Sequence, residues 1–171
     1  RKNQDYCLPT PLNTPVRAPA GQISIYRFFD PIFINHMSSS DANEVGPENG
    51  YQFEGLAFRT FARAFRDAKE LFRCRSATGK LTSYVTDDSA CEGPGHILDG
   101  SLGFVSTVEY EATPVSLFRC YNATHNDHLM TTDRSECNGT NGYVVEFGGP
   151  VGYVADCSIA CAARSIRIAQ W

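Results

Sequence analysis

Three neighbouring residues, Asn126-Asp127-His128, have the clearest capacity for recognition chemistry in this chain, and they lie in or beside a predicted turn. An exposed acid and amide at a turn can accept and donate hydrogen bonds to vicinal sugar hydroxyls, and Tyr121 or Met130 would supply an apolar face beside them. The alternative interpretation is that Asp127 and His128 only cap their own turn.

Two weaker candidates for ligand binding occur elsewhere in the chain. The pair Asn35-His36, with Phe33 nearby, offers an amide, an imidazole and an apolar ring. The side chains of the third candidate are Tyr84, Lys80 and Asp88.

Two sequences, Asn122-Ala123-Thr124 and Asn138-Gly139-Thr140, match the acceptor motif for N-glycosylation. A glycan on Asn122 would crowd the candidate at Asp127, and would make Asn35-His36 the better candidate. The two motifs and the seven cysteines favour an oxidising compartment. We therefore expect a secreted protein.

Composition and motifs exclude several classes of function. The net charge of −4 provides no basic surface for nucleic acid, and no apolar run approaches the roughly 18 residues of a membrane span. There is no nucleophile elbow, no zinc-protease motif and no phosphate-binding glycine loop. We therefore expect that the protein is not an enzyme and that it binds no cofactor. A zinc site at His125-x-x-His128 with Cys157 and Cys161 is less favoured, because disulfides explain the cysteines better.

The residues discussed above belong to a repeated framework. Ile25-Tyr26-Arg27-Phe28, Leu71-Phe72-Arg73-Cys74 and Leu117-Phe118-Arg119-Cys120 recur at a spacing of 46 residues. Internal repetition of this kind decides the architecture, and it favours a binding scaffold over a single asymmetric catalytic cleft.

The cysteines follow the same repeat. Two pairs have a spacing of 17 residues, and the first copy has Phe28 and Val45 at the corresponding positions, as expected if the two positions are in contact. We therefore predict the disulfides Cys74–Cys91 and Cys120–Cys137. The remaining three cysteines suggest that Cys7 pairs with Cys157 or Cys161, which leaves one thiol to be buried or to link two chains.

Each copy predicts a four-stranded β unit. The first strands are expected at 24–29, 70–75 and 116–121, the second strands end near residues 41, 87 and 133, and two further strands are expected within 50–58, 95–104 and 142–153. Asp41-x-x-Glu44 and Asp133-x-x-Glu136 resemble an N-cap with a capping-box partner, and predict a helical turn that leads to the second cysteine.

Three such units arranged about a pseudo-threefold axis form a β-trefoil, whereas a propeller needs about four blades. We expect an amino-terminal strap at 1–22, which is rich in proline, and a single all-β domain at 23–171 with repeats at about 23–68, 69–114 and 115–171. The tail 164–171, with Trp171, is predicted to form the closing strand.

Three sets of charged residues recur in all copies, and we interpret them as structural, because a group needed in every copy holds the fold rather than one ligand. The sets are Arg27, Arg73 and Arg119; Asp41, Asp87 and Asp133; and Glu54, Asp99 and Glu146.

The repeats resemble a known family over roughly residues 24–155. The family has the consensus YRFYNP, DHFYTT and GYxYEGIAF, which is similar to 25–31, 126–132 and 50–58 of this chain. The resemblance implies a β-trefoil, lectin-like module of largely unassigned function. The chain departs from the consensus, since Asp-His is kept only as Asp127-His128 and is replaced by Leu81-Thr82 in the second copy.

From these observations we expect a secreted, lectin-like module that binds glycans or glycoproteins weakly at one or two of three related pockets. The alternative is an extracellular protein-binding or structural module, for example an inhibitor, in which the sugar pockets are vestigial and loops contact a protein partner. A disulfide-linked dimer would suit this alternative.

Overall fold

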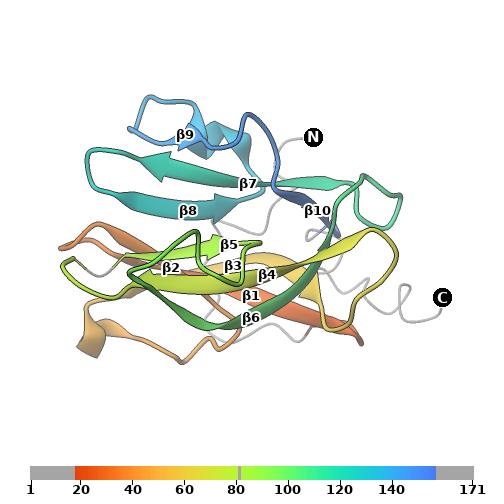
Figure 1. Ribbon diagram of the computed structural model, residues 1–171, viewed down its shortest axis with the longest axis horizontal. Coiled ribbons are helices and arrows are strands. Elements are labelled where there is room, and N and C mark those ends of the chain that lie inside the picture. The colour runs from red at the N-terminus through yellow and green to blue at the C-terminus, as the bar shows by residue number, and fades with distance from the viewer. Residues whose placement is uncertain (1–17, 81, 157–171) are drawn as a thin grey trace.

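The computed structural model describes residues 18–80 and 82–156, and this part of the chain is all-β (Figure 1). Most of the predicted strap, the cysteines Cys7, Cys157 and Cys161, and the tail with Trp171 lie outside the described residues. The strands are β1 (Gln22–Asp30), β2 (Asn35–Ser39), β3 (Gln52–Phe61), β4 (Ala68–Ser76), β5 (Ser83–Thr86), β6 (His96–Ser106), β7 (Val115–Asn122), β8 (Asp127–Thr131), β9 (Val144–Val145) and β10 (Gly152–Val154), and the short 3-10 turns are η2 (Pro47–Asn49) and η3 (Arg134–Cys137).

The strands pair in the same way in three stretches of chain, which we call segment 1 (23–68), segment 2 (69–114) and segment 3 (from 115). In each segment a first strand pairs antiparallel with the two strands that follow it: β1 with β2 and β3, β4 with β5 and β6, and β7 with β8 and β9. The ladders of β1 and β4 shift register at corresponding places, after Ile25 and Arg27 and after Leu71 and Arg73.

The segments are joined through shared strand edges and through their hairpins. β3 pairs with β6, and β10 pairs with both β6 and β7, so that one sheet path runs through all three segments. The second strands β2, β5 and β8 contact one another. In Figure 1 the hairpin β7–β8 accordingly lies against β5 and β2.

The prediction of first strands is confirmed, but the prediction of four separate strands per unit is wrong for segments 1 and 2. There the expected third and fourth strands form one continuous strand, β3 or β6. Only segment 3 separates them, as β9 and β10, where Gly148-Gly149-Pro150 intervenes. Proline has no amide hydrogen for a ladder, which accounts for the interruption.

The strand register corrects two sequence alignments in segment 2. Ser83 pairs with Arg75 as His36 pairs with Phe29, so Thr82-Ser83, and not Leu81-Thr82, corresponds to Asn35-His36. The β4–β5 connection is one residue longer than its counterparts. For the same reason Asp88 takes the place expected for Asp87, because the Asp88 carboxylate accepts the amide hydrogen of Ala90 at 2.8 Å, as Asp41 does from Asn43.

One apolar core lies between the segments, and each segment adds a smaller cluster of its own. The repeated residues Ile25, Leu71 and Leu117 are at most 1% exposed and belong to the central core, with Phe58 and Val105. The local clusters lie between each first strand and the turn that follows the second strand.

Both predicted disulfides within the described residues are present, Cys74–Cys91 and Cys120–Cys137. In segment 1 Phe28 is buried, and Val45 packs against the same local cluster. An apolar pair thus fills the place that a disulfide fills in the other two segments.

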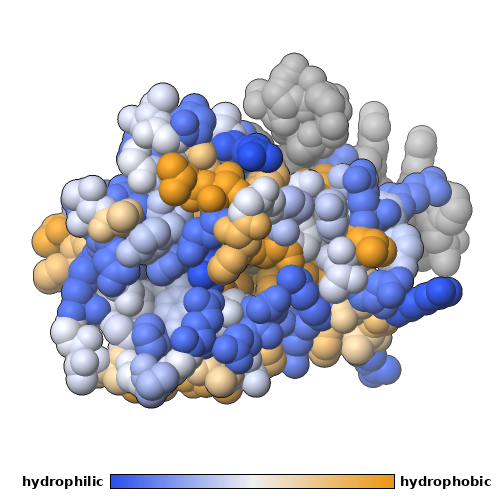
Figure 2. All heavy atoms as spheres, turned by 45° about the horizontal axis from the view of Figure 1, so that its top comes forward, coloured by the Kyte–Doolittle hydropathy of each residue, from blue (hydrophilic) through white to orange (hydrophobic). Residues whose placement is uncertain are grey.

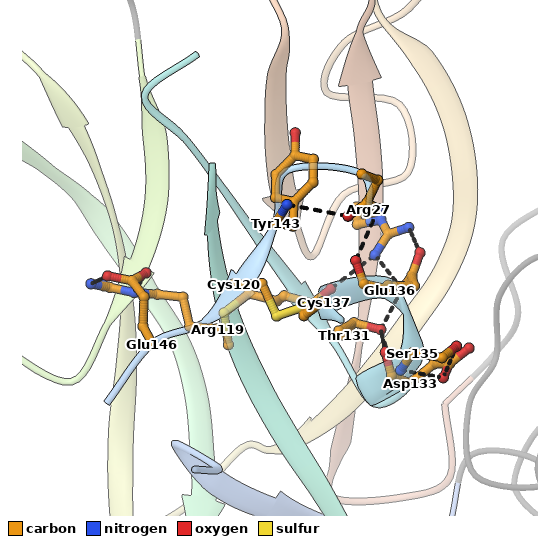
Figure 3. Close-up of a disulfide and its surroundings, with 12 residues drawn as sticks. Arg27, Arg119, Cys120, Thr131, Asp133, Ser135, Glu136, Cys137, Tyr143 and Glu146 are labelled. Atoms are coloured by element: carbon orange, nitrogen blue, oxygen red, sulfur yellow. Dashed lines mark hydrogen bonds and ion pairs between the residues drawn. A yellow bond between two sulfur atoms is a disulfide. The ribbon is translucent and has the colours of Figure 1, made fainter. Parts of the chain in front are cut away.

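The predicted helical turn occurs at η3, where Asp133 caps the turn by accepting the amide hydrogen of Ser135 at 3.0 Å (Figure 3). The prediction that Glu136 is the capping-box partner of Asp133 is wrong. Its carboxylate instead accepts the Thr131 hydroxyl and an ion pair from Arg27, which belongs to another segment. The Asp41 carboxylate begins only a turn.

Each repeated arginine bonds to two segments. Arg27 pairs with Glu136 of segment 3 at 2.8 Å (Figure 3). It also pairs with Glu54 of its own segment at 2.7 Å, and its Nη1 donates to the Met130 carbonyl at 3.1 Å. Burial opposes the charged form, but the two carboxylates outweigh it and raise the pKa of Arg27.

The other two arginines repeat these contacts in a closed cycle, from segment 2 to segment 1 and from segment 3 to segment 2. The contacts are Arg73 with Asp99, Glu44 and the Ser38 carbonyl, and Arg119 with Glu146, Glu92 and the Val85 carbonyl. The structural interpretation of the repeated charges therefore extends beyond single copies, because each arginine also binds the neighbouring segment.

Replacing Arg27 tests this arrangement. Arg27→Met leaves Glu54, Glu136 and a buried carbonyl without their donor, and we expect a loss of about 3–5 kcal/mol in the free energy of unfolding, measured in urea. Arg66→Met is the control, because Arg66 is 93% exposed and its ion pair with Asp67 is 3.9 Å long. A loss at Arg27 no larger than at Arg66 would contradict the assignment.

Candidate functional site

The strongest sequence candidate, Asp127, is fully buried at the junction of segments 3 and 1. Its Oδ1 accepts the backbone amide hydrogen of His36 at 2.8 Å, and its Oδ2 lies 2.6 Å from His36 Nδ1 and 2.5 Å from the Tyr143 hydroxyl. Burial favours the neutral acid, but the contacts with His36 and Tyr143 outweigh it and lower the pKa of Asp127. The expectation of an exposed acid is wrong.

Asn35 repeats this arrangement at the junction of segments 1 and 2. It is 2% exposed, donates to the Tyr51 hydroxyl at 2.7 Å, and accepts the Ser83 amide hydrogen at 3.2 Å. His36 is also buried, with its ring 4.5 Å from that of Phe29. The pair thus takes part in the same kind of junction as Asp127.

His128 lies at the third junction, between segments 2 and 3. Its ring is 4.5 Å from that of Tyr121 and 5.5 Å from that of Tyr84, and its Nε2 is 3.5 Å from a Glu146 oxygen. Burial lowers the pKa of His128, against the opposing charge of Glu146. Its Nδ1 has no hydrogen-bond partner among the described residues, because Thr82 occupies the position that corresponds to Asp127.

The remaining predicted ligand residues are engaged locally. Tyr84 is buried and donates to the Cys91 carbonyl at 2.6 Å. Asn126 is exposed, and its side chain accepts the Tyr121 hydroxyl at 3.1 Å. The structure therefore brings Asp127 together with His36, and His128 with Tyr84, but mainly as contacts between segments.

The two glycosylation motifs differ in accessibility. The Asn122 side chain is 5% exposed and accepts the amide hydrogens of Thr124 and His125. Asn138 is exposed and accepts both the amide and the hydroxyl hydrogen of Thr140. Glycosylation stays a prediction at both residues, and only Asn138 presents an accessible side chain.

A groove that the sequence did not predict lies between segments 2 and 3, and we call it the Phe147 groove. Its volume is about 350 Å³, and its floor consists of the buried side chains of Leu71, Val85 and Met130. One wall is formed by Phe147, Pro150 and Val151, and the other by Lys69, Thr86, Asp87, Asp88 and Glu92. Figure 2 shows a hollow near the centre of the visible face, with hydrophobic and hydrophilic atoms around it.

Phe147 is the most unusual residue of this groove. It is 70% exposed and has φ = 62°, in the left-handed region that disfavours side chains. The corresponding residues beside Arg27 and Arg73 are Gly55 and Gly100, which also have positive φ. A large exposed side chain in place of glycine is a conformational cost of the kind that concentrates at functional sites.

The Arg119 guanidinium packs against one face of the Phe147 ring. Its guanidinium carbon is 4.7 Å from the ring centroid, and the arginine is itself held by Glu92 and Glu146. The repeated arginine that joins segments 2 and 3 thus also positions the aromatic ring.

Among the acids of the groove, Asp87 is the most available. Its side chain is 56% exposed, and only its Oδ2 is engaged within the described residues, by Lys69 Nζ at 3.0 Å. Asp88 accepts the amide hydrogens of Ala90 and Glu92, and both Glu92 oxygens bind Arg119. The pair of Asp87 and Lys69 thus offers one free acceptor and further donors next to an exposed ring.

Within residues 18–80 and 82–156, no three metal-binding side chains lie close enough to hold a metal ion. The same residues include no helix of the length and apolar character needed to cross a membrane.

The role of Asp127 predicts a specific dependence on pH. Because its pKa is lowered on folding, its contribution to stability is complete above its unfolded pKa of about 3.9 and is lost as the pH falls through the lower folded pKa. We expect Asp127→Asn to reduce the free energy of unfolding at pH 7 by about 1–3 kcal/mol. In urea titrations this deficit should shrink between pH 4 and pH 2.

The exposed Asp87 provides the matched control for this experiment. Asp87→Asn should cost little at any pH. A deficit for Asp127→Asn that stays constant down to pH 2 would show that the carboxylate charge does not hold the junction.

The comparisons with known proteins add one finding. A family model described as a domain of unknown function (DUF5648) matches residues 12–93, which include segment 1 and the first part of segment 2. No curated protein matches the chain. No solved structure matches it either.

Proposed function

We propose that this all-β chain is a β-trefoil in which the three segments surround a pseudo-threefold axis. The proposal rests on the shared pairing of the first strands, the contacts among β2, β5 and β8, and the closed cycle of arginine contacts. The resemblance to lectin-like repeats supports the same arrangement.

We further propose that the protein is a secreted, non-catalytic module that binds carbohydrate, and that the Phe147 groove is its binding site. The single observation that carries this proposal is the exposed Phe147 in a left-handed conformation, where segments 1 and 2 have glycine. An exposed aromatic ring beside available polar groups suits a sugar, which has an apolar C–H face and hydroxyls at its edge. The two disulfides are compatible with an extracellular location.

In this proposal the groove recognises a neutral pyranose. The C–H face of the sugar stacks on Phe147, one hydroxyl donates to Asp87 Oδ1, and the adjacent hydroxyl accepts a hydrogen bond from Lys69. The geometry of a vicinal diol matches an acceptor and a donor that already lie 3.0 Å apart. The floor of Met130 and Val85 excludes water from beneath the ring.

The proposed site differs from those expected at Asp127 and at Asn35-His36, although it includes Met130, which was expected beside Asp127, and Asp88, which belonged to the third candidate with Tyr84 and Lys80. A buried and fully bonded carboxylate cannot reach a ligand unless the junction opens. Ligand binding at the Asp127 junction stays a weaker hypothesis for the same reason.

The alternative function, protein binding, is favoured by a different observation. Ile32 and Phe33 project from the β1–β2 connection with exposures of 77% and 64%. This surface is separate from the Phe147 groove.

A glycan array probed with a multimerised form of the protein tests the carbohydrate proposal, since single lectin sites bind weakly and gain from avidity. For the best sugar, we expect Phe147→Gly to weaken binding at least tenfold in calorimetric titrations of the unmultimerised protein. Its free energy of unfolding should change by less than about 1 kcal/mol, because glycine relieves the left-handed strain.

Val144→Ala is the matched control, because Val144 is 52% exposed on β9 and does not line the groove. It should leave sugar affinity unchanged. Binding that survives Phe147→Gly would place the site elsewhere, and a folded protein that binds no glycan would remove the proposal.

A further inference from the structure

Among the described residues, the two most exposed large apolar side chains outside the Phe147 groove are adjacent. Ile32 is 77% exposed and Phe33 is 64% exposed, and both lie in the connection between β1 and β2. We call these two residues the apolar tip. The corresponding connections of the other segments, 77–81 and 123–126, include no large apolar pair among their described residues. The fold therefore does not require apolar side chains here.

The apolar tip is held in one conformation. Asp30 is buried, and its Oδ1 accepts the amide hydrogens of Ile32 at 2.9 Å and of Phe33 at 3.2 Å. On the other side of the turn, Lys80 Nζ donates to the Ile34 carbonyl at 2.9 Å. A tip that is ordered before binding loses little conformational entropy on binding.

A second, mostly apolar groove lies at the other end of β1, beside Gly21. It has a volume of about 460 Å³ and is lined by Phe61, Phe65, Tyr110, Ala112 and other residues of the β3–β4 and β6–β7 connections. We call it the Tyr110 groove. The rings of Phe61 and Phe65 pack edge to face at 5.0 Å, and the Tyr110 hydroxyl binds Asp67, so the groove is also preformed.

The two surfaces cannot meet within one molecule. The nine residues of β1 separate them, and a strand of this length extends about 30 Å. Figure 1 shows the β1–β2 connection and the β3–β4 connection at opposite ends of the molecule. A contact between them therefore requires two molecules.

We infer that the apolar tip of one copy of this chain binds in the Tyr110 groove of a second copy. Both surfaces are apolar and preformed. The tip consists of two projecting side chains, and a concave apolar surface such as the Tyr110 groove can enclose them. The net charge of −4 disfavours an anionic lipid surface as the occupant. Because tip and groove are different surfaces at opposite ends, the contact is heterologous and can continue from molecule to molecule.

Such an assembly goes beyond the proposed carbohydrate site and does not depend on it. Each added copy would carry its own Phe147 groove, so that a weak site would gain avidity without another contact.

Complementary blocking variants test the inference by sedimentation velocity over a range of concentrations. The wild type should sediment faster as its concentration rises. The tip variant Ile32→Ser/Phe33→Ser and the groove variant Ala112→Glu should each stay monomeric to at least tenfold higher concentration. A one-to-one mixture of the two variants should form a dimer and nothing larger, because only one tip and one groove remain usable.

The control is Leu98→Ser, which removes a 46% exposed side chain outside both surfaces and should assemble like the wild type. Unchanged melting temperatures show that each variant is folded. The inference is overturned if the wild type stays monomeric at millimolar concentration, if Ala112→Glu alone still assembles, or if the mixture of variants does not associate.

Discussion

Each repeated arginine forms ion pairs with acids from two segments, and the rest of the fold depends on this arrangement. Arg27, Arg73 and Arg119 join segments 1 to 3, 2 to 1 and 3 to 2, and each also donates to a carbonyl of the neighbouring second strand. Among the described residues, the local cluster of each segment has three to five buried members, whereas the core that the segments share has eleven. The guanidinium groups fix the segments in the orientation in which Ile25, Leu71 and Leu117 can share one core.

Further contacts between the segments explain why the most polar candidates in the sequence do not form an open site. Asp127 binds the backbone and ring of His36, Asn35 binds the backbone of Ser83, and His128 lies between Tyr84 and Tyr121. The side chains of Asp127 and Asn35 thus accept backbone amide hydrogens at the junctions, which would otherwise be buried without an acceptor. The proposed recognition therefore involves residues at which one segment departs from the others, namely Phe147 and the exposed pair Ile32 and Phe33.

Local sequence patterns predicted much of the fold. The features that were not predicted depend on contacts between residues far apart in the sequence. The first strands, both described disulfides and the η3 turn followed from alternation, spacing and capping residues near one another in the chain. The acceptors of Arg27 in segment 3 lie more than a hundred residues away and have no local signal. The Phe147 groove escaped prediction because its walls come from different segments. The substitution of Phe147 for Gly55 and Gly100 was visible in the aligned repeats, but its exposure and left-handed conformation, which single it out, are shown only by the structure.

The central claim is that ion pairs between segments hold the three segments as one domain, and a double-mutant cycle tests it most directly. Arg27→Met, Glu136→Gln and the double variant would be unfolded in urea, with Arg66→Met and Glu136→Gln as the uncoupled comparison. The account predicts a coupling energy of about 1–3 kcal/mol between Arg27 and Glu136, and additivity for Arg66. Additivity within about 0.5 kcal/mol for Arg27 and Glu136 would contradict the account.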